Sequence, residues 1–174
     1  MILNLLVQQK FQNKMNKKKY LFVIIVLFAL LFSGCDYIFC KYKNLPDLGN
    51  GYKFGIGDCR TLDIINHDNT EMIAPEIVFF AFDSTFILAA QRPWDSIPGV
   101  DTMTYGERHK AFKKSTFLQY WIINKKEENV YAGVDSIAER AIYSNVYGPY
   151  KWKEYIQKRK ELGVSKELKL KKVE

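Results

Sequence analysis

The feature that most constrains this fold is an apolar run from Tyr20 to Phe32. Three lysines, Lys17 to Lys19, precede it, and a positive segment followed by about 7–15 apolar residues is typical of an export signal. A membrane-spanning helix would need about 20 apolar residues, and Gly34 and Asp36 end this run too early. We therefore expect residues 1–34 to be a signal peptide that takes no part in the folded domain.

A second methionine, Met15, gives a more compact signal than Met1 does. Starting at Met15 places the three lysines directly behind the initiator, whereas residues 1–14 add a segment that such signals do not need. We expect translation to start at Met15.

The signal ends in Leu31-Phe32-Ser33-Gly34-Cys35. This run resembles the lipobox of bacterial lipoproteins, although Phe32 stands where leucine is usual. The resemblance implies cleavage before Cys35 and attachment of a diacylglycerol to its thiol, often with a further acyl chain on the new amino terminus. Two or three acyl chains hold a protein stably to a bilayer. We expect a lipid anchor at Cys35 that holds the domain to the cell membrane or the outer membrane, facing the periplasm or the exterior. An uncleaved signal anchor and an ordinary secreted protein are the alternatives.

Removal of the signal changes the charge of the protein. It takes away five lysines and no acid, so the net charge falls from +7 to +2. The mature chain therefore gives no reason to expect a nucleic-acid partner. From Lys151 onwards nine Lys/Arg accompany four Glu, which indicates a solvated helix face and tail or a contact with anionic headgroups.

The remaining 140 residues suffice for one domain with its own core. Residues 35–50 are polar and contain Pro46, as suits a lipidated N-terminus with a short tether, and residues 51–174 form the domain. Cys40 and Cys59 are either free thiols or partners in a disulfide, which would close a loop of about 20 residues.

Four runs of apolar, β-branched and aromatic residues predict strands in the first part of this domain: Gly51–Ile56, Arg60–Ile65, Glu76–Phe82 and Thr85–Gln91. The last two form a hairpin with Asp83-Ser84 as its turn. Because Ile77–Phe82 scarcely alternates, we expect it to be a central strand, covered on both faces.

A long punctuated segment, 92–115, follows this hairpin. We expect a loop with a short helical turn at Glu107–Phe112. Ordered loops of this length often carry function. We therefore place a candidate partner-binding surface at four of its residues: Trp94, Tyr105, Arg108 and His109.

The rest of the chain returns to strand and ends in a helix. Thr116–Asn124 alternates apolar side chains on both faces, and Val130–Gly133 is expected to pair back onto it. Asp135–Tyr143 is predicted as a short helix, and Pro149–Leu162 as an amphipathic helix stopped by Gly163. The fold class is α+β, a mainly antiparallel sheet of about five or six strands with the C-terminal helix packed on it. A small β-sandwich or barrel with an added helix is the alternative.

Parts of this half also match a known pattern, in the order Tyr120-Trp121-Ile122-Ile123-x-Lys125, Val130-Tyr131, Gly148-Pro149 and Lys158-x-x-Glu161-Leu162-Gly163-Val164. The series resembles an uncharacterised family of small bacterial lipoproteins, with Ala132–Tyr147 as an insertion. The resemblance covers about a third of the chain, supports the fold and the lipid anchor, and brings no catalytic residues.

Signals of catalysis are scarce. The two histidines, His67 and His109, have no zinc-binding spacing, and no nucleophile motif is present. We expect no metal, no cofactor and no enzymatic activity. The favoured function is a binding or structural module of the cell envelope that holds a protein or glycan partner.

The alternative function is a small hydrolase whose acids meet in three dimensions. Asp58, Asp63, Asp83 and Asp101 are the acids considered for such a meeting. Asp101, Glu107 and His109 are the candidate catalytic residues.

Overall fold

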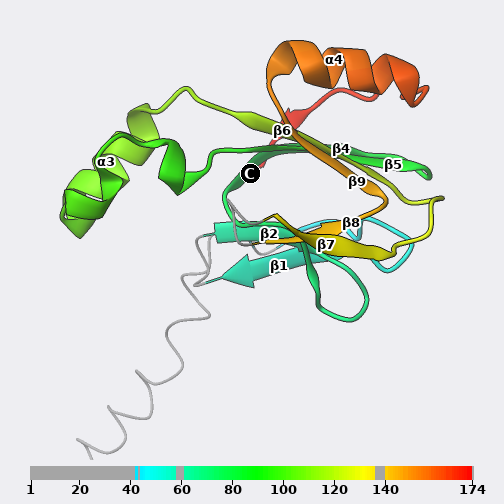
Figure 1. Ribbon diagram of the computed structural model, residues 1–174, viewed down its shortest axis with the longest axis horizontal. Helices are drawn as coiled ribbons and strands as arrows, with labels where there is room; N and C mark the ends of the chain where they lie inside the picture. The colour runs from blue at the N-terminus through cyan, green and yellow to red at the C-terminus, as the bar shows by residue number, and fades with distance from the viewer. Residues whose placement is uncertain (1–41, 43, 58–60, 136–139, 174) are drawn as a thin grey trace, which may run out of the picture. The chain divides into compact units, whose positions relative to one another are not determined.

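The computed structural model describes residues 42, 44–57, 61–135 and 140–173 (Figure 1). Cys35, Cys40 and Cys59, the predicted lipidation site and the predicted disulfide pair, lie outside these residues, as does Asp58. A compact unit runs from Tyr42 to Glu174.

The main element of this unit is a five-stranded sheet whose paired strands are all antiparallel. Its strands in spatial order are β10 (Lys171–Lys172), β4 (Ile77–Phe82), β5 (Phe86–Gln91), β6 (Gln119–Asn124) and β9 (Val146–Tyr150). All six residues of β5, the middle strand, are buried. β4, predicted as a central strand covered on both faces, lies between β10 and β5 and contributes Ile77 to one core and Ala81 to the other. The outer edge of β4 pairs with the two residues of β10, and the Val173 N–H donates to the Val78 carbonyl at 3.1 Å.

The turn between β4 and β5 explains why this hairpin was recognisable in the sequence. One carboxylate oxygen of Asp83 accepts hydrogen bonds from the backbone N–H groups of Thr85 and Phe86, both at 2.7 Å. An aspartate that bonds the backbone two residues further on is a typical turn former.

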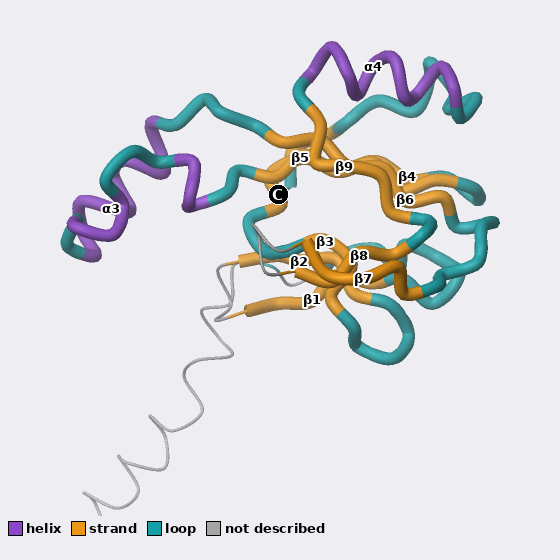
Figure 2. Tube along the Cα trace, viewed as in Figure 1, coloured by secondary structure: helices purple, strands orange, loops and turns teal. Residues whose placement is uncertain are grey.

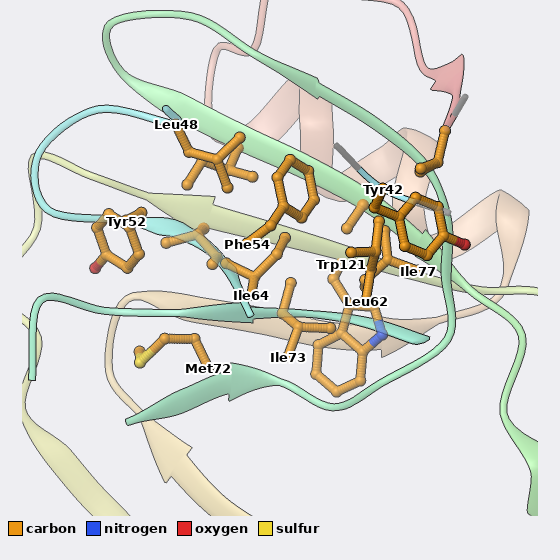
Figure 3. Packing of buried hydrophobic residues seen from close by; sticks show 14 residues of the cluster. Tyr42, Leu48, Tyr52, Phe54, Leu62, Ile64, Met72, Ile73, Ile77 and Trp121 are labelled. Carbon is orange, nitrogen blue, oxygen red and sulfur yellow. The ribbon is translucent and has the colours of Figure 1, made fainter. Parts of the chain in front are cut away.

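Five further strands lie on one side of this sheet (Figure 2). β1 (Lys53–Gly57), β2 (Thr61–Ile65) and β3 (Glu71–Ile73) form a three-stranded antiparallel sheet, and β7 (Tyr131–Asp135) and β8 (Arg140–Tyr143) form a two-stranded ribbon. Phe54, Leu62 and Ile64 from the small sheet meet Ile87 and Trp121 from the large one in a shared core (Figure 3).

The other face of the five-stranded sheet is covered by helix α4 (Trp152–Glu161) (Figure 2). The Tyr155 side chain is fully buried there, against a cluster that includes Leu88 and Ile122. The apolar side chains of β6 point to both faces of the sheet, since Trp121 and Ile123 enter one core and Ile122 enters the other. Both faces of the sheet must therefore be covered. The predicted α+β class, with its C-terminal helix on an antiparallel sheet, is confirmed.

Three local predictions are wrong. Val130–Gly133 does not pair with β6, and the strand that follows β6 in the sheet is β9. The stretch Asp135–Tyr143, predicted as a helix, instead contains β8, which pairs with β7. The helical prediction rested on three apolar positions. The described residues of this stretch form strands instead, because β-branched and aromatic residues such as Ile142 and Tyr143 favour β-structure. The last helix begins at Trp152, because the preceding residues, Pro149 included, extend β9.

Three of the described residues before β1, Tyr42, Leu48 and Tyr52, belong to the core. Tyr42 and Leu48, which the sequence placed in the tether, are 8% and 0% exposed, so the segment left to act as a tether is shorter than residues 35–50. Lys125 fixes this segment, since its buried ammonium donates to the Leu48 carbonyl at 2.6 Å and to the Asp83 carbonyl. Burial lowers the pKa of Lys125, against the opposing effect of the Asp83 and Asp47 carboxylates.

Candidate functional site

The segment that carries the four predicted binding residues leaves and re-enters the five-stranded sheet at the same end. Gln91, the last residue of β5, pairs with Gln119, the first of β6. Gln91 is buried and donates to the carbonyls of Ala74 and Pro75 while it accepts from the Trp121 indole at 3.0 Å. These hydrogen bonds hold Gln91, the residue from which the segment leaves the sheet, in a fixed position.

Between these strands the chain forms two short 3-10 turns, η1 (Trp94–Ser96) and η2 (Val100–Thr102), and then helix α3 (Tyr105–Lys114). The helix is longer than the predicted turn at Glu107–Phe112 because it is capped. The Thr104 hydroxyl accepts from the Glu107 N–H, and the Glu107 carboxylate accepts from the Thr104 N–H at 2.9 Å, which is a capping box. No residue of α3 is buried, and the helix stands away from the sheet (Figure 1).

Four rings form a continuous series that we call the α3 stack: Tyr105, His109, Trp94 and Phe112. The centroid distances along the series are 5.4 Å, 6.1 Å and 4.3 Å, and neighbouring rings are within 23° of parallel. Tyr105 and His109 are four residues apart on one helix face, and Trp94 lies against both His109 and Phe112. The series ends in Tyr105, whose side chain is 68% exposed.

The half-buried end of the α3 stack, Trp94 and Phe112, is tied to the sheet. The Trp94 indole donates to the Glu76 carboxylate at 2.6 Å, and Glu76 is itself buried just before β4. Arg92 adds a second tie, since its guanidinium donates to the Phe112 carbonyl at 3.2 Å and lies 5.3 Å from the centre of that ring. The rings are therefore held in place although the helix that carries three of them is not packed on the sheet.

The structure brings together three of the four predicted residues, Trp94, Tyr105 and His109. Arg108 has a different role, because its guanidinium turns back to the carbonyls of Met103 and Asp101 at 3.0 and 3.3 Å. It thereby fastens the start of α3 to η2. Sequence reasoning missed Glu76, Arg92 and Phe112, of which only Phe112 left a signal, in its spacing of three residues from His109.

The solvent face of α3 is basic. Lys110, Lys113 and Lys114 are exposed, and the acid within the helix, Glu107, is engaged in the cap. Hydrogen bonds from Thr104 lower the pKa of Glu107 and keep this carboxylate ionised. The site therefore combines an exposed ring with three free-standing positive charges.

The residues considered for a hydrolase are placed in other roles. Glu107 caps α3, and Asp83 forms the β4–β5 turn. Asp63 lies in β2, over Gly55, where an added Cβ would come within 2.0 Å of its carboxylate. Burial raises the pKa of Asp63, and burial together with the Asp63 charge raises the pKa of Glu71.

Metal-binding groups give no alternative site within the described part of the chain. There, no cluster of three or more His, Cys, Asp or Glu side chains is suited to hold a metal ion. His67 lies in an exposed turn, with its ring 3.1 Å from the Asp68 carboxylate. Among the same residues no helix is long and apolar enough to cross a bilayer.

Comparison with known proteins gives one match. The model of a family described as "Protein of unknown function (DUF3997)" matches residues 60–174, which includes the α3 stack, the five-stranded sheet and α4. No curated protein and no solved structure matches the chain.

Proposed function

The chain belongs to the DUF3997 family, whose function is unknown, and from this premise we propose that it is a lipid-anchored binding module of the cell envelope. Cys35 carries the lipid, and the α3 stack with its neighbouring lysines forms the binding surface. The domain works by holding a component of the envelope next to the membrane and not by chemistry.

One observation carries the proposal: the α3 stack is ordered by ties to the sheet but is not covered by it. Trp94 and Phe112 are held by Glu76 and Arg92, while Tyr105 remains 68% exposed on a helix with no buried residue. Tryptophan and tyrosine are enriched among the residues that dominate binding energy. A ring fixed in this way loses little conformational freedom when it is covered.

The proposal that the lipid is at Cys35 is supported by the sequence and by the start of the folded unit. The described domain begins with a buried Tyr42, seven residues after Cys35. An acyl anchor there would keep the binding surface near the bilayer, where an envelope component is concentrated.

The binding surface is tested by photocrosslinking in intact cells. A benzophenone side chain at Tyr105 of the full-length protein is expected to form a defined adduct with an envelope component, detected by mass spectrometry of the peptide that contains residue 105. The matched control is Val134 in β7, which is 57% exposed. Equal adducts at the two positions, or none at Tyr105, would contradict the proposed surface.

The anchor is tested separately by metabolic labelling with palmitate. We expect label in the wild type and in Cys59→Ala, and none in Cys35→Ala. Labelling of Cys35→Ala would contradict the anchor without affecting the crosslinking result.

A further inference from the structure

Exposed aromatic side chains gather at the end of the five-stranded sheet from which α3 extends. Tyr120 pairs with Tyr150 there, so α4 starts at the same end at which the α3 segment leaves and returns. Tyr105, Phe117 and Trp152 lie in these connections and are 68%, 43% and 53% exposed. They come from two connections, β5–β6 and β9–α4, so the feature belongs to this end of the domain and not to one loop.

Lysines accompany these rings. Lys151 and Lys153 flank Trp152, and Lys110, Lys113 and Lys114 follow Tyr105 in α3; all five are exposed. The acids inside these segments are partly engaged, since Glu107 caps α3 and Glu154 accepts from the Lys151 N–H at 2.8 Å. Asp95 and Asp101 in the 3-10 turns also lie at this end, as does the buried Glu76, which accepts from the Trp94 indole.

The chain enters the folded domain at this same end. Tyr42 packs in the core that contains Ile77, and Figure 3 places it on the Ile77 and Trp121 side, away from Tyr52. Ile77 pairs with Gln91, and the neighbouring Glu76 holds Trp94, so the entry point adjoins the base of the α3 stack. Seven residues from Cys35 to Tyr42 span at most about 25 Å. A lipid at Cys35 would therefore keep this end close to the bilayer.

From these observations we propose that the component bound by the α3 stack is the anionic headgroup layer of the anchoring membrane. The inference deepens the proposed function and rests on it. Tyr105, Phe117 and Trp152 lie at the level of the headgroups, which is where tyrosine and tryptophan concentrate in membrane proteins. The five lysines pair with acidic lipids, whose surface potential attracts basic segments.

The membrane is favoured over a protein partner by the position of the surface. The rings and lysines lie in two connections at the end of the sheet where the chain enters the domain, and the short tether limits the space left between them and the bilayer. The contact fixes how the domain is oriented on the membrane and leaves the β7–β8 ribbon, with exposed Val134 and Ile142, as a separate apolar surface.

The test uses the full-length lipidated protein reconstituted into vesicles of phosphatidylcholine with or without phosphatidylglycerol, both containing lipid brominated near the headgroup. We expect several-fold stronger quenching of tryptophan fluorescence in the anionic vesicles and loss of this excess at high salt. Trp152→Phe is expected to reduce the quenched signal and to leave the part that comes from Trp94 in the α3 stack, since Trp121 is buried at 3% exposure.

A matched pair of charge reversals tests the surface itself. Lys151→Glu with Lys153→Glu is expected to abolish the excess quenching, and Lys160→Glu with Lys166→Glu, equally exposed residues near and beyond the other end of α4, to retain it. Urea midpoints equal to that of the wild type establish that both variants fold. Equal quenching in neutral and anionic vesicles, or an equal effect of the two pairs, would overturn the inference.

The outcomes separate this inference from the proposed function. If palmitate labels Cys35 and residue 105 crosslinks to a protein while quenching does not depend on charged lipid, the binding module stands and the lipid partner is wrong. If Cys35 carries no palmitate label, there is no anchor at that residue. The seven residues from Cys35 to Tyr42 then no longer limit the distance between the domain and the bilayer, and the membrane contact loses its support.

Discussion

The two described helices have similar local sequences but very different surroundings. α3 and α4 are both ten residues long, carry a glutamate that bonds the backbone of the residue before the helix, and have basic residues in the last turn. α4 buries Tyr155 completely against the sheet, whereas α3 buries nothing. Isolated helices of this length are marginal in water. α4 is thus stabilised by tertiary packing, and α3 by its cap and its ring contacts.

The largest test of this difference is truncation of one tyrosine on each helix. Tyr155→Ala is expected to lower the free energy of unfolding by about 3–5 kcal/mol, because it removes a fully buried aromatic ring. Tyr105→Ala is expected to change it by no more than about 0.5 kcal/mol, as surface substitutions do. Urea denaturation of both variants gives the comparison, and similar losses would mean that α3 is part of the cooperative core.

The ends of the helices provide the next test. α4 closes with Gly163 at φ +70°, and the N–H groups of Gly163 and Val164 donate to the carbonyls of Lys160 and Arg159 in a Schellman motif. Gly163→Ala is expected to cost about 1–2 kcal/mol, since a side chain is strained in this left-handed conformation. Ser165→Ala, just beyond the motif, is the control in the same urea series, and a Gly163→Ala variant as stable as the control would contradict this role.

Loss of the α3 cap is expected to have a smaller and local effect. Thr104→Ala removes the hydroxyl that accepts from Glu107 N–H, which is worth about 1 kcal/mol of helix stability. Because α3 is not packed on the sheet, faster amide hydrogen exchange should be confined to this helix, with β5 and β6 unchanged. Thr102→Ala, on the preceding turn, serves as the control. Acceleration that spreads to β5 would show that the two regions unfold together.

A fall in pH should affect α3 and α4 differently as well. The pKa of Glu107 is lowered in the folded protein, so its stabilising contribution is present above the ordinary value of 4.5 and is lost as the pH falls through the lower folded value. Exchange protection of α3 should decline as the pH falls below about 4.5, and Glu107→Gln should remove this dependence. A decline that persists in Glu107→Gln would assign it to other groups.

The sequence predicted those parts of the fold that local signals determine. The β4–β5 hairpin follows from two apolar runs and Asp83, and the two-sided character of β6 is visible in its alternation. The pairing of β6 with β9 could not be read in this way, because Ile123 meets Val146 only after the β7–β8 ribbon has been inserted between them. Register across such a distance depends on tertiary contacts.

The candidate surface was predictable to a similar degree. Trp94, Tyr105 and His109 share one segment, so a common surface was a reasonable hypothesis, although their stacking required the full length of α3. Glu76, which fixes Trp94, comes from another part of the chain and has no local signal. The backbone contacts of Arg108 could not be predicted, because a basic side chain beside exposed rings indicates a ligand as readily as it indicates a bond to its own backbone.

Lys125 gives the domain a mechanical property. Its ammonium joins the Leu48 carbonyl to the Asp83 carbonyl, and its own N–H donates to the Thr85 carbonyl at 2.8 Å. A pulling force applied to the chain before Tyr42 therefore passes through Leu48 into the β4–β5 turn, and from there into the strands at the centre of the sheet. Part of such a load is carried by the hairpin that contains β5, all of whose residues are buried.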